Sequence, residues 1–173
     1  MKTLIIFRHA KSAWEDHALA DIDRPLAPRG RAASPLMGAW FRDNGWKPDH
    51  IICSSAQRTR ETLALALPFF SHDHCITVTR ALYEGSGDAY VERAKNESNK
   101  TNTLMLIGHN PSSEDAAAFF ARSGDPALHS AMAAKFPTAA AAVIRFNADS
   151  WSDLVAGCGE LIAFQTPRGL RAA

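Results

Sequence analysis

The apolar stretch TLIIFRH at residues 3–9 opens the chain and indicates what kind of sheet it forms. A continuous run of apolar, partly β-branched residues is typical of a strand that is covered on both faces. Residues 103–109, TLMLIGH, repeat the pattern later in the chain. Both runs end in a histidine, and open α/β sheets bind their ligands at the carboxyl ends of such strands. The two runs therefore predict a covered sheet with His9 and His109 at a site along one edge.

Strand and helix patterns alternate over most of the remaining chain. Helix 30–44 has the clearest apolar periodicity, in which Ala33, Leu36, Met37, Trp40 and Phe41 form the predicted buried stripe. The other expected strands are 51–53, 76–79, 141–146 and 160–164, the other helices are 56–67, 87–96 and 110–122, and residues 151–154 are a candidate pairing segment. This alternation predicts an α/β sandwich with a largely parallel sheet.

Composition limits the classes of function that are open to this chain. It has 173 residues, of which 46% are hydrophobic and 21% are charged, with a net charge of +1. We expect a single domain over residues 1–173, without binding to nucleic acid or a membrane surface through bulk charge. The N-terminal apolar run is too short for a signal peptide or a membrane span. Three separated cysteines without a CxxC pair indicate reduced thiols in a cytoplasmic protein.

Polar groups follow three of the predicted strands. Arg8 and His9 come after the first, residues 54–55 and then Arg58 after the second, and His109 after the run at 103–107. If these strands are neighbours, two arginines, two histidines and two helix N-termini converge. Donors that arrive from several directions suit a tetrahedral phosphoryl group better than a carboxylate. The sequence thus predicts a site for a phosphate or sulfate anion.

Several segments in the same order resemble the histidine phosphatase superfamily, which also contains the phosphoglycerate mutases. Within it, the resemblance is to the SixA-type phosphohistidine phosphatase branch, although Ala10 replaces a usual glycine and Ala27 stands where a capping threonine is common. The segments that carry the resemblance are 7–12 (FRHAKS), 23–30 (DRPLAPRG), 54–62 (SSAQRTRET), 82–84 (LYE), 108–111 (GHNP), 137–138 (PT) and 167–170 (PRGL).

The resemblance implies a phosphoglycerate mutase-like fold, a three-layer α/β/α sandwich with a mostly parallel mixed central sheet. It also implies that His9 is the nucleophile, whose neutral imidazole attacks phosphorus, while Arg8, Arg58 and His109 hold the non-bridging oxygens. Their positive charge would offset the charge on the phosphoryl group. We expect Arg8 and Arg58 to lower the pKa of His9, and His109 to act better in its protonated form.

Other residues have less certain roles in the same site. Glu84 is the candidate general acid, and its alternative is a loop carboxylate paired with an arginine. Lys11 and Ser12 are candidate substrate-binding residues because they follow His9 closely. Glu61 lies one helical turn from Arg58 and is expected to orient it. Asp21 is expected to organise its loop rather than to react.

The predicted function is that of a phosphohistidine phosphatase that acts on a phosphorylated protein, for example a histidine phosphotransfer domain, without metal or cofactor. The alternatives are a small-molecule phosphomonoesterase, a phosphoglycerate mutase-like transferase and a non-catalytic phosphoprotein-binding module. The short segment 83–103 leaves little room for the insertion that covers the site in relatives acting on metabolites. A metallohydrolase is disfavoured because His72 and His74 lack a carboxylate frame.

Overall fold

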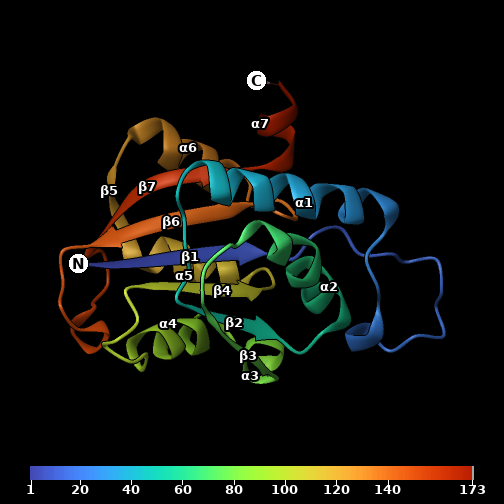
Figure 1. Ribbon diagram of the computed structural model, residues 1–173, viewed down its shortest axis with the longest axis horizontal. Coiled ribbons are helices and arrows are strands. Elements are labelled where there is room, and N and C mark those ends of the chain that lie inside the picture. The colour runs from blue at the N-terminus through green and yellow to red at the C-terminus, as the bar shows by residue number, and fades with distance from the viewer. Residues whose placement is uncertain (173) are drawn as a thin grey trace.

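The computed structural model describes residues 1–172, in which seven strands form one mixed sheet in the order β3-β2-β4-β1-β6-β7-β5 (Figure 1). The strands are β1 (Lys2–Arg8), β2 (His50–Ser54), β3 (Cys75–Thr79), β4 (Thr103–Gly108), β5 (Ala121–Gly124), β6 (Ala141–Phe146) and β7 (Gly159–Gln165). Strand β6 is antiparallel to both of its neighbours, and the other neighbouring pairs are parallel. The prediction of a mostly parallel mixed sheet is confirmed.

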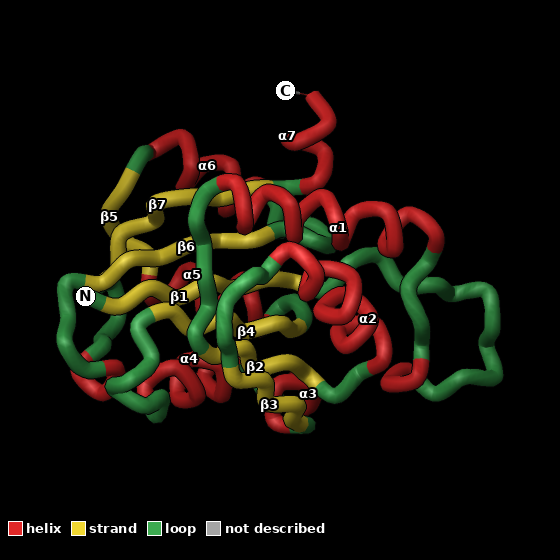
Figure 2. The backbone as a smooth tube through the Cα atoms, in the orientation of Figure 1, coloured by secondary structure: helices red, strands yellow, loops and turns green. Residues whose placement is uncertain are grey.

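All but the last of the helices lie between two strands along the chain, and a long loop joins β1 to the first helix (Figure 2). They are α1 (Pro28–Asp43), α2 (Gln57–Ala66), α3 (Ala81–Glu84), α4 (Gly87–Lys95), α5 (Ser112–Phe120), α6 (Pro126–Ala134) and α7 (Pro167–Ala172), with 3-10 turns η1 (Asp21–Asp23), η2 (Leu67–Phe69) and η3 (Trp151–Asp153).

Strand β1 is buried on both faces, as its continuous apolar run predicts. Ile5 and Phe7 belong to one core cluster, which contains buried side chains of α1 and α2. Leu4 and Ile6 belong to the other cluster, which contains buried side chains of α4 and α5. Since successive residues of a strand point to opposite faces, the two clusters define helices on either side of the sheet. The expected three-layer α/β/α sandwich is confirmed.

Helix α1 agrees only in part with its predicted apolar stripe. Ala33, Met37 and Phe41 are buried, but Leu36 is 37% exposed. Gly38 is also buried, and an added Cβ atom there would lie 2.6 Å from the Phe69 ring. The helix packs closely through a glycine, a contact that a search for large apolar residues does not detect.

Two predicted elements of the second half of the chain are wrong. The helix expected to continue through Arg122 ends at Phe120, because the next residues pair with β7 as strand β5. The candidate pairing segment 151–154 instead begins with the 3-10 turn η3. Its Trp151 is buried, and the indole nitrogen donates to the Thr101 carbonyl at 2.8 Å. Both corrections reflect tertiary contacts that local periodicity does not contain.

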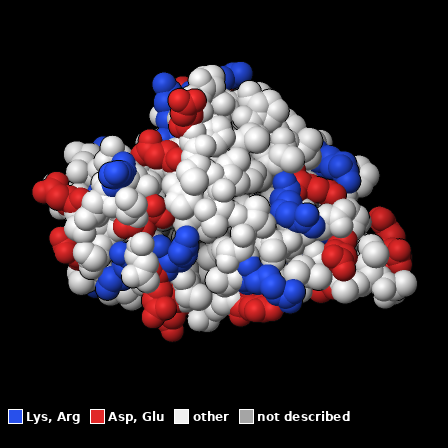
Figure 3. All heavy atoms as spheres, turned by 60° about the horizontal axis from the view of Figure 1, so that its bottom comes forward, with Lys and Arg blue, Asp and Glu red and all other residues white. Residues whose placement is uncertain are grey.

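Three properties describe the surface and the thiols of residues 1–172: membrane-spanning potential, charge distribution and cysteine state. No helix in this part of the chain is long and apolar enough to cross a membrane. On the face in Figure 3, basic and acidic side chains are interspersed, without a large field of one sign. The three cysteines are all free thiols, with Cys53 buried and Cys75 and Cys158 exposed.

The register of the central strands brings the polar strand ends together. Arg8 of β1 lies opposite Gly108 of β4, so His9 and His109 follow at the same edge of the sheet. Strand β4 also pairs with β2, whose last residues are Cys53 and Ser54. Gly108 is packed so closely that an added Cβ atom would overlap the hydroxyl and ring of Tyr90.

We therefore expect Gly108→Ala to lower the free energy of unfolding by about 1–3 kcal/mol, because the buried Tyr90 ring has to move. Gly169→Ala in helix α7 is the matched control, since its Cβ atom would approach the flexible end of the Gln165 side chain and lie at an ordinary contact distance, 3.5 Å, from Thr166 Oγ1. Urea denaturation of both variants measures the difference. Equal stability of the two variants would contradict the close packing of Gly108.

Candidate active site

His9 follows β1 and is held in one tautomer. Its Nδ1 atom lies 2.6 Å from the Ala10 carbonyl oxygen. A carbonyl only accepts hydrogen bonds, so Nδ1 carries the proton and Nε2 presents a lone pair. The side chain is buried, and burial is the main cause that lowers the pKa of His9 to about 3. The hydrogen bond to Ala10 opposes this effect, and the nearby His109, Arg58 and Arg8 add to it. His9 is therefore a neutral imidazole with a nucleophilic Nε2 at physiological pH.

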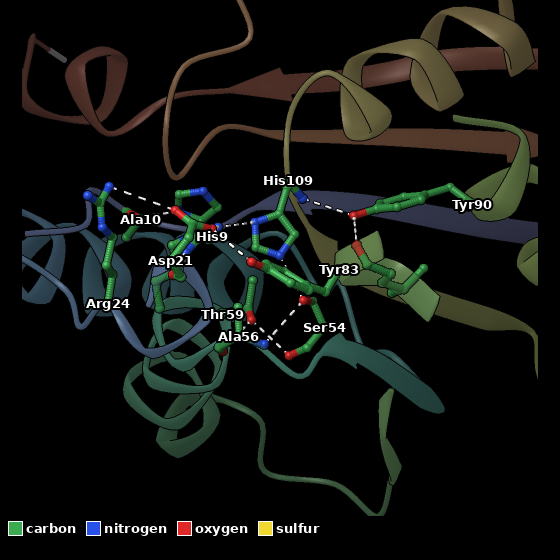
Figure 4. Close-up of polar contacts among 12 residues, drawn as sticks. His9, Ala10, Asp21, Arg24, Ser54, Ala56, Thr59, Tyr83, Tyr90 and His109 are labelled. Atoms are coloured by element: carbon green, nitrogen blue, oxygen red, sulfur yellow. Dashed lines mark hydrogen bonds and ion pairs between the residues drawn. The ribbon is translucent and has the colours of Figure 1, made fainter. Parts of the chain in front are cut away.

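His109 lies beside His9, with 5.0 Å between the two ring centroids. Its Nδ1 atom lies 3.3 Å from an Arg58 Nη2 atom, which only donates, so Nδ1 accepts. The proton is then on Nε2, which donates to Ser54 Oγ at 2.7 Å (Figure 4). Burial and, after it, the positive charge of Arg58 together lower the pKa of His109 to about 4. In this arrangement His109 is also neutral.

Arg58 reaches the site from the first turn of α2 and is fixed by the loop before α1. It donates to the Asp21 carbonyl at 2.6 Å and to Asp21 Oδ2 at 2.9 Å. The Tyr83 hydroxyl donates to the same carboxylate at 3.1 Å. Burial alone would raise the pKa of Asp21, but the hydrogen bond and charge of Arg58 outweigh burial and hold the pKa below its usual value. Figure 4 shows Asp21 and Tyr83 near His9 and His109.

Arg8 is held by the segment that precedes β6. Its Nη1 atom donates to the Phe136 carbonyl at 2.6 Å, an oxygen that also accepts from the Asn110 side chain at 3.2 Å. Asn110 in turn donates to Glu114 at 2.8 Å. Burial lowers the pKa of Arg8, and the charge of Glu114 opposes this effect. Arg8 Nε is buried without a hydrogen-bond partner among the described residues, so it has a free donor.

The remaining predicted site residues do not join this cluster. The Glu84 carboxylate pairs with Arg80 at 2.9 Å and is 59% exposed. Lys11 lines a cavity next to α1, and Ser12 is buried and forms a β-bridge with Leu26. No hydrogen bond joins Glu84, Lys11 or Ser12 to His9 within residues 1–172. Their proposed roles remain predictions.

Glu61 does not contact Arg58 as the sequence suggested. Its Oε2 atom accepts from the Leu26 backbone nitrogen at 2.8 Å and pairs with Arg31 at 3.2 Å. The carboxylate faces the loop before α1, and the guanidinium is oriented by Asp21 instead. The expectation for Glu61 was wrong because helical spacing alone does not show which partner a side chain faces.

Sequence analysis missed the functional contacts of Asp21, Tyr83 and Thr62. Thr62 Oγ1 accepts from the Ala10 backbone nitrogen at 3.0 Å and so steadies the turn that contains His9. The Tyr83 ring lies edge-on to His109, with 5.6 Å between centroids. The only sequence signal for these residues was that polar side chains recur near the predicted strand ends. This pattern does not show which side chains form hydrogen bonds with each other across distant parts of the chain.

The site can hold a compact anion. Two neutral histidines and two arginines surround it, and the arginines supply fixed positive charge in a largely buried setting. Within residues 1–172 there is no cluster of three or more histidine, cysteine or acidic side chains able to hold a metal ion. His72, for example, has Nε2 within hydrogen-bond distance of the Pro48 carbonyl, at 2.9 Å.

The layered fold and the paired histidines flanked by arginines define an α/β protein with a cluster of histidine and arginine side chains at the carboxyl ends of its central strands. The family model of the histidine phosphatase superfamily (branch 1) matches residues 4–144, and the chain belongs to this superfamily. An uncharacterized protein of Mycobacterium tuberculosis is 38% identical over 163 residues, which cover 93% of this chain and 99% of the relative. An uncharacterized chloroplastic protein of Arabidopsis thaliana is 31% identical and covers 91% of this chain and 72% of its own length.

Solved structures support the same branch of the superfamily. The putative phosphohistidine phosphatase SixA from Agrobacterium tumefaciens is 28% identical, with a TM-score of 0.80 and coverage of 96% of this chain and 98% of its own. The putative SixA from Nakamurella multipartita is also 28% identical, with a TM-score of 0.82 and coverage of 96% of both chains. The expected resemblance to SixA-type proteins is therefore confirmed.

The lowered pKa values of the two histidines predict acid destabilisation. Above pH 6.5 both are neutral in the folded and unfolded states, whereas below it the unfolded chain takes up protons first. The free energy of unfolding should fall as the pH drops from about 6.5 towards 4. His109→Gln should lose about 1–2 kcal/mol less than the wild type between pH 7 and pH 5. Urea denaturation at the two pH values measures this, with exposed His17→Gln as the control, and equal losses in all three proteins would contradict the expectation.

Proposed function

We propose that this protein removes the phosphoryl group from a phosphohistidine of a protein, through a phosphohistidine intermediate on its own His9 and without a metal ion. The observation that carries the proposal is the 2.6 Å hydrogen bond from His9 Nδ1 to the Ala10 carbonyl, which leaves Nε2 unprotonated. A neutral, fixed imidazole between guanidinium groups is the form that nucleophilic attack on phosphorus requires.

In the first step, His9 Nε2 attacks phosphorus in line with the bond to the leaving nitrogen. The new N–P bond forms on His9 as the N–P bond of the substrate breaks. The substrate ring, protonated on its other nitrogen, takes the electron pair of the broken bond and leaves as neutral imidazole. Arg8 and Arg58 hold the non-bridging oxygens and neutralise their charge. Most of the rate gain in such a transfer comes from position and electrostatic stabilisation. The dianion also raises the pKa of His109, which then donates from Nδ1 in place of accepting from Arg58.

In the second step, water attacks the phosphorus atom of the intermediate. The N–P bond on His9 breaks, inorganic phosphate is released and the neutral imidazole is restored. The hydrogen bond from Nδ1 to Ala10 is compatible with both steps because it leaves Nε2 as the only reacting nitrogen. No cofactor is needed for this balance of atoms and electrons.

A phosphorylated protein is the favoured substrate for two reasons. The putative SixA proteins, which are described as phosphohistidine phosphatases, match 96% of this chain at 28% identity. A further SixA structure, described as a protein histidine phosphatase complexed with tungstate, supports binding of a tetrahedral oxyanion by this fold. The segment between α3 and β4 contains only helix α4 and short connections, which supports a site that admits a side chain of a protein.

His9→Ala should reduce phosphate release from a phosphohistidine peptide and from p-nitrophenyl phosphate by at least about 10³-fold, since the nucleophile is lost. Inorganic phosphate should still bind, as measured by calorimetry, because Arg8 and Arg58 remain. His17→Ala is the control on an exposed histidine. Undiminished turnover by His9→Ala would refute the mechanism. Loss of wild-type activity in EDTA would refute metal independence. Formation of an isomerised product without free phosphate would indicate a transferase.

The role of Glu84 as general acid has its own test. If Glu84 protonates the leaving atom, Glu84→Gln should lower kcat for a phenyl phosphate by about 10–100-fold. The effect on a phosphohistidine peptide should be smaller, because a protonated phosphohistidine ring leaves as neutral imidazole, whereas phenoxide is an anion unless an acid protonates it. Arg80→Gln, which removes only the ion-pair partner, is the control. Equal activity of Glu84→Gln and the wild type on both substrates would leave Glu84 a surface carboxylate.

A further inference from the structure

A cavity of about 450 Å³ is lined in part by Lys11, two residues after His9. Its walls come from α1, from α7, from the segment 135–138 and from the turn after β1. Figure 1 shows α7 beside α1 at the C-terminal end of the chain, and the two helices are in contact. The cavity volume is in the range of sites that hold a ligand group rather than a single water molecule.

The walls of this cavity are strongly basic. Its lining contains five cationic side chains and no acidic one: Lys11, Arg29, Lys135, Arg168 and Arg171. None of the five has an ion-pair partner within residues 1–172. The whole chain has a net charge of only +1, so this is a local concentration of uncompensated positive charge. Such a cavity attracts anions.

The basic cavity and the histidine site share a wall. The Phe136 carbonyl accepts from Arg8, and the residues on either side of Phe136, Lys135 and Pro137, line the cavity. The Ala139 nitrogen donates to the His9 carbonyl at 3.0 Å, directly after this segment. Lys11 lines the cavity two residues after His9. A substrate whose phosphoryl group lies at His9 is therefore next to the cavity.

The cationic groups are distributed over four separate chain segments, so one small anion does not contact them all. Ala33, Pro137 and Pro167 also line the cavity, and their apolar surface suits the methylene groups of extended side chains. A flexible segment with several acidic side chains would match both the dispersed cationic groups and the apolar surface. We propose that the basic cavity binds acidic side chains next to the phosphohistidine of the protein substrate, an inference that rests on the proposed function and specifies its substrate.

The test compares phosphohistidine peptides that differ only in charge. One peptide has three glutamates on the N-terminal side of the phosphohistidine, a second has them on the C-terminal side, and a third has glutamines at all six positions. We expect wild-type kcat/KM to be at least about 5-fold higher for one acidic peptide than for the glutamine peptide, mainly through a lower KM. In 1 M salt, where screening acts over about 3 Å, the preference should disappear.

Charge reversal in the cavity identifies its contribution. Arg168→Glu in α7 and Arg29→Glu in α1 should each abolish most of the preference, while turnover of p-nitrophenyl phosphate stays unchanged. Arg42→Glu reverses the same kind of charge at the other end of α1, where Arg42 pairs with Asp43, and should keep the preference. Two cavity variants on different helices separate loss of recognition from a local folding defect.

The outcomes separate this inference from the proposed function. Hydrolysis of all three peptides with equal kcat/KM would overturn the acidic-segment inference and leave the proposed function standing. A preference that survives in both Arg168→Glu and Arg29→Glu would also overturn it. Hydrolysis of p-nitrophenyl phosphate without hydrolysis of any peptide would refute the phosphohistidine substrate, and the inference would fail with it.

Discussion

The parallel pairing of β1 with β4 is the constraint on which the rest of the site depends. Arg8 lies opposite Gly108, so the next residue of each strand is a histidine, and the two rings lie 5.0 Å apart. Each strand is anchored by apolar side chains on both faces, which resists a shift in register. A shift by one residue would separate the histidines and move their neighbours to the wrong face.

Burial at this edge has a direct chemical consequence. It keeps His9 and His109 neutral, although an isolated histidine takes up a proton near pH 6.5. The positive charge of the site then resides on Arg8 and Arg58, whose guanidinium groups stay charged. Asp21 partly balances Arg58 and links the loop before α1 to the site. The nucleophile and the anion-binding groups are thereby separate residues with separate protonation states.

The sequence predicted elements best where apolar patterns were continuous, as in β1 and β4. It failed where a contact with a distant segment ends or redirects an element. Pairing of β5 with β7 ends α5 at Phe120, and a buried Trp151 accompanies a 3-10 turn instead of a strand. Glu61 illustrates the same limit for side chains, since it faces Leu26 and Arg31 rather than Arg58.

By itself, the sequence determined that polar residues follow three covered strands, and that His9, Arg8, Arg58 and His109 are the residues to consider for a phosphoryl group. Strand runs and strand ends are local patterns, so they are visible in the chain. Only the tertiary structure decided which hydrogen bonds set the tautomer of His9, which loop holds Arg58, and that α7 closes a basic cavity beside the site. These contacts join segments that are far apart in the chain. A local pattern of residues does not show which distant segments come into contact.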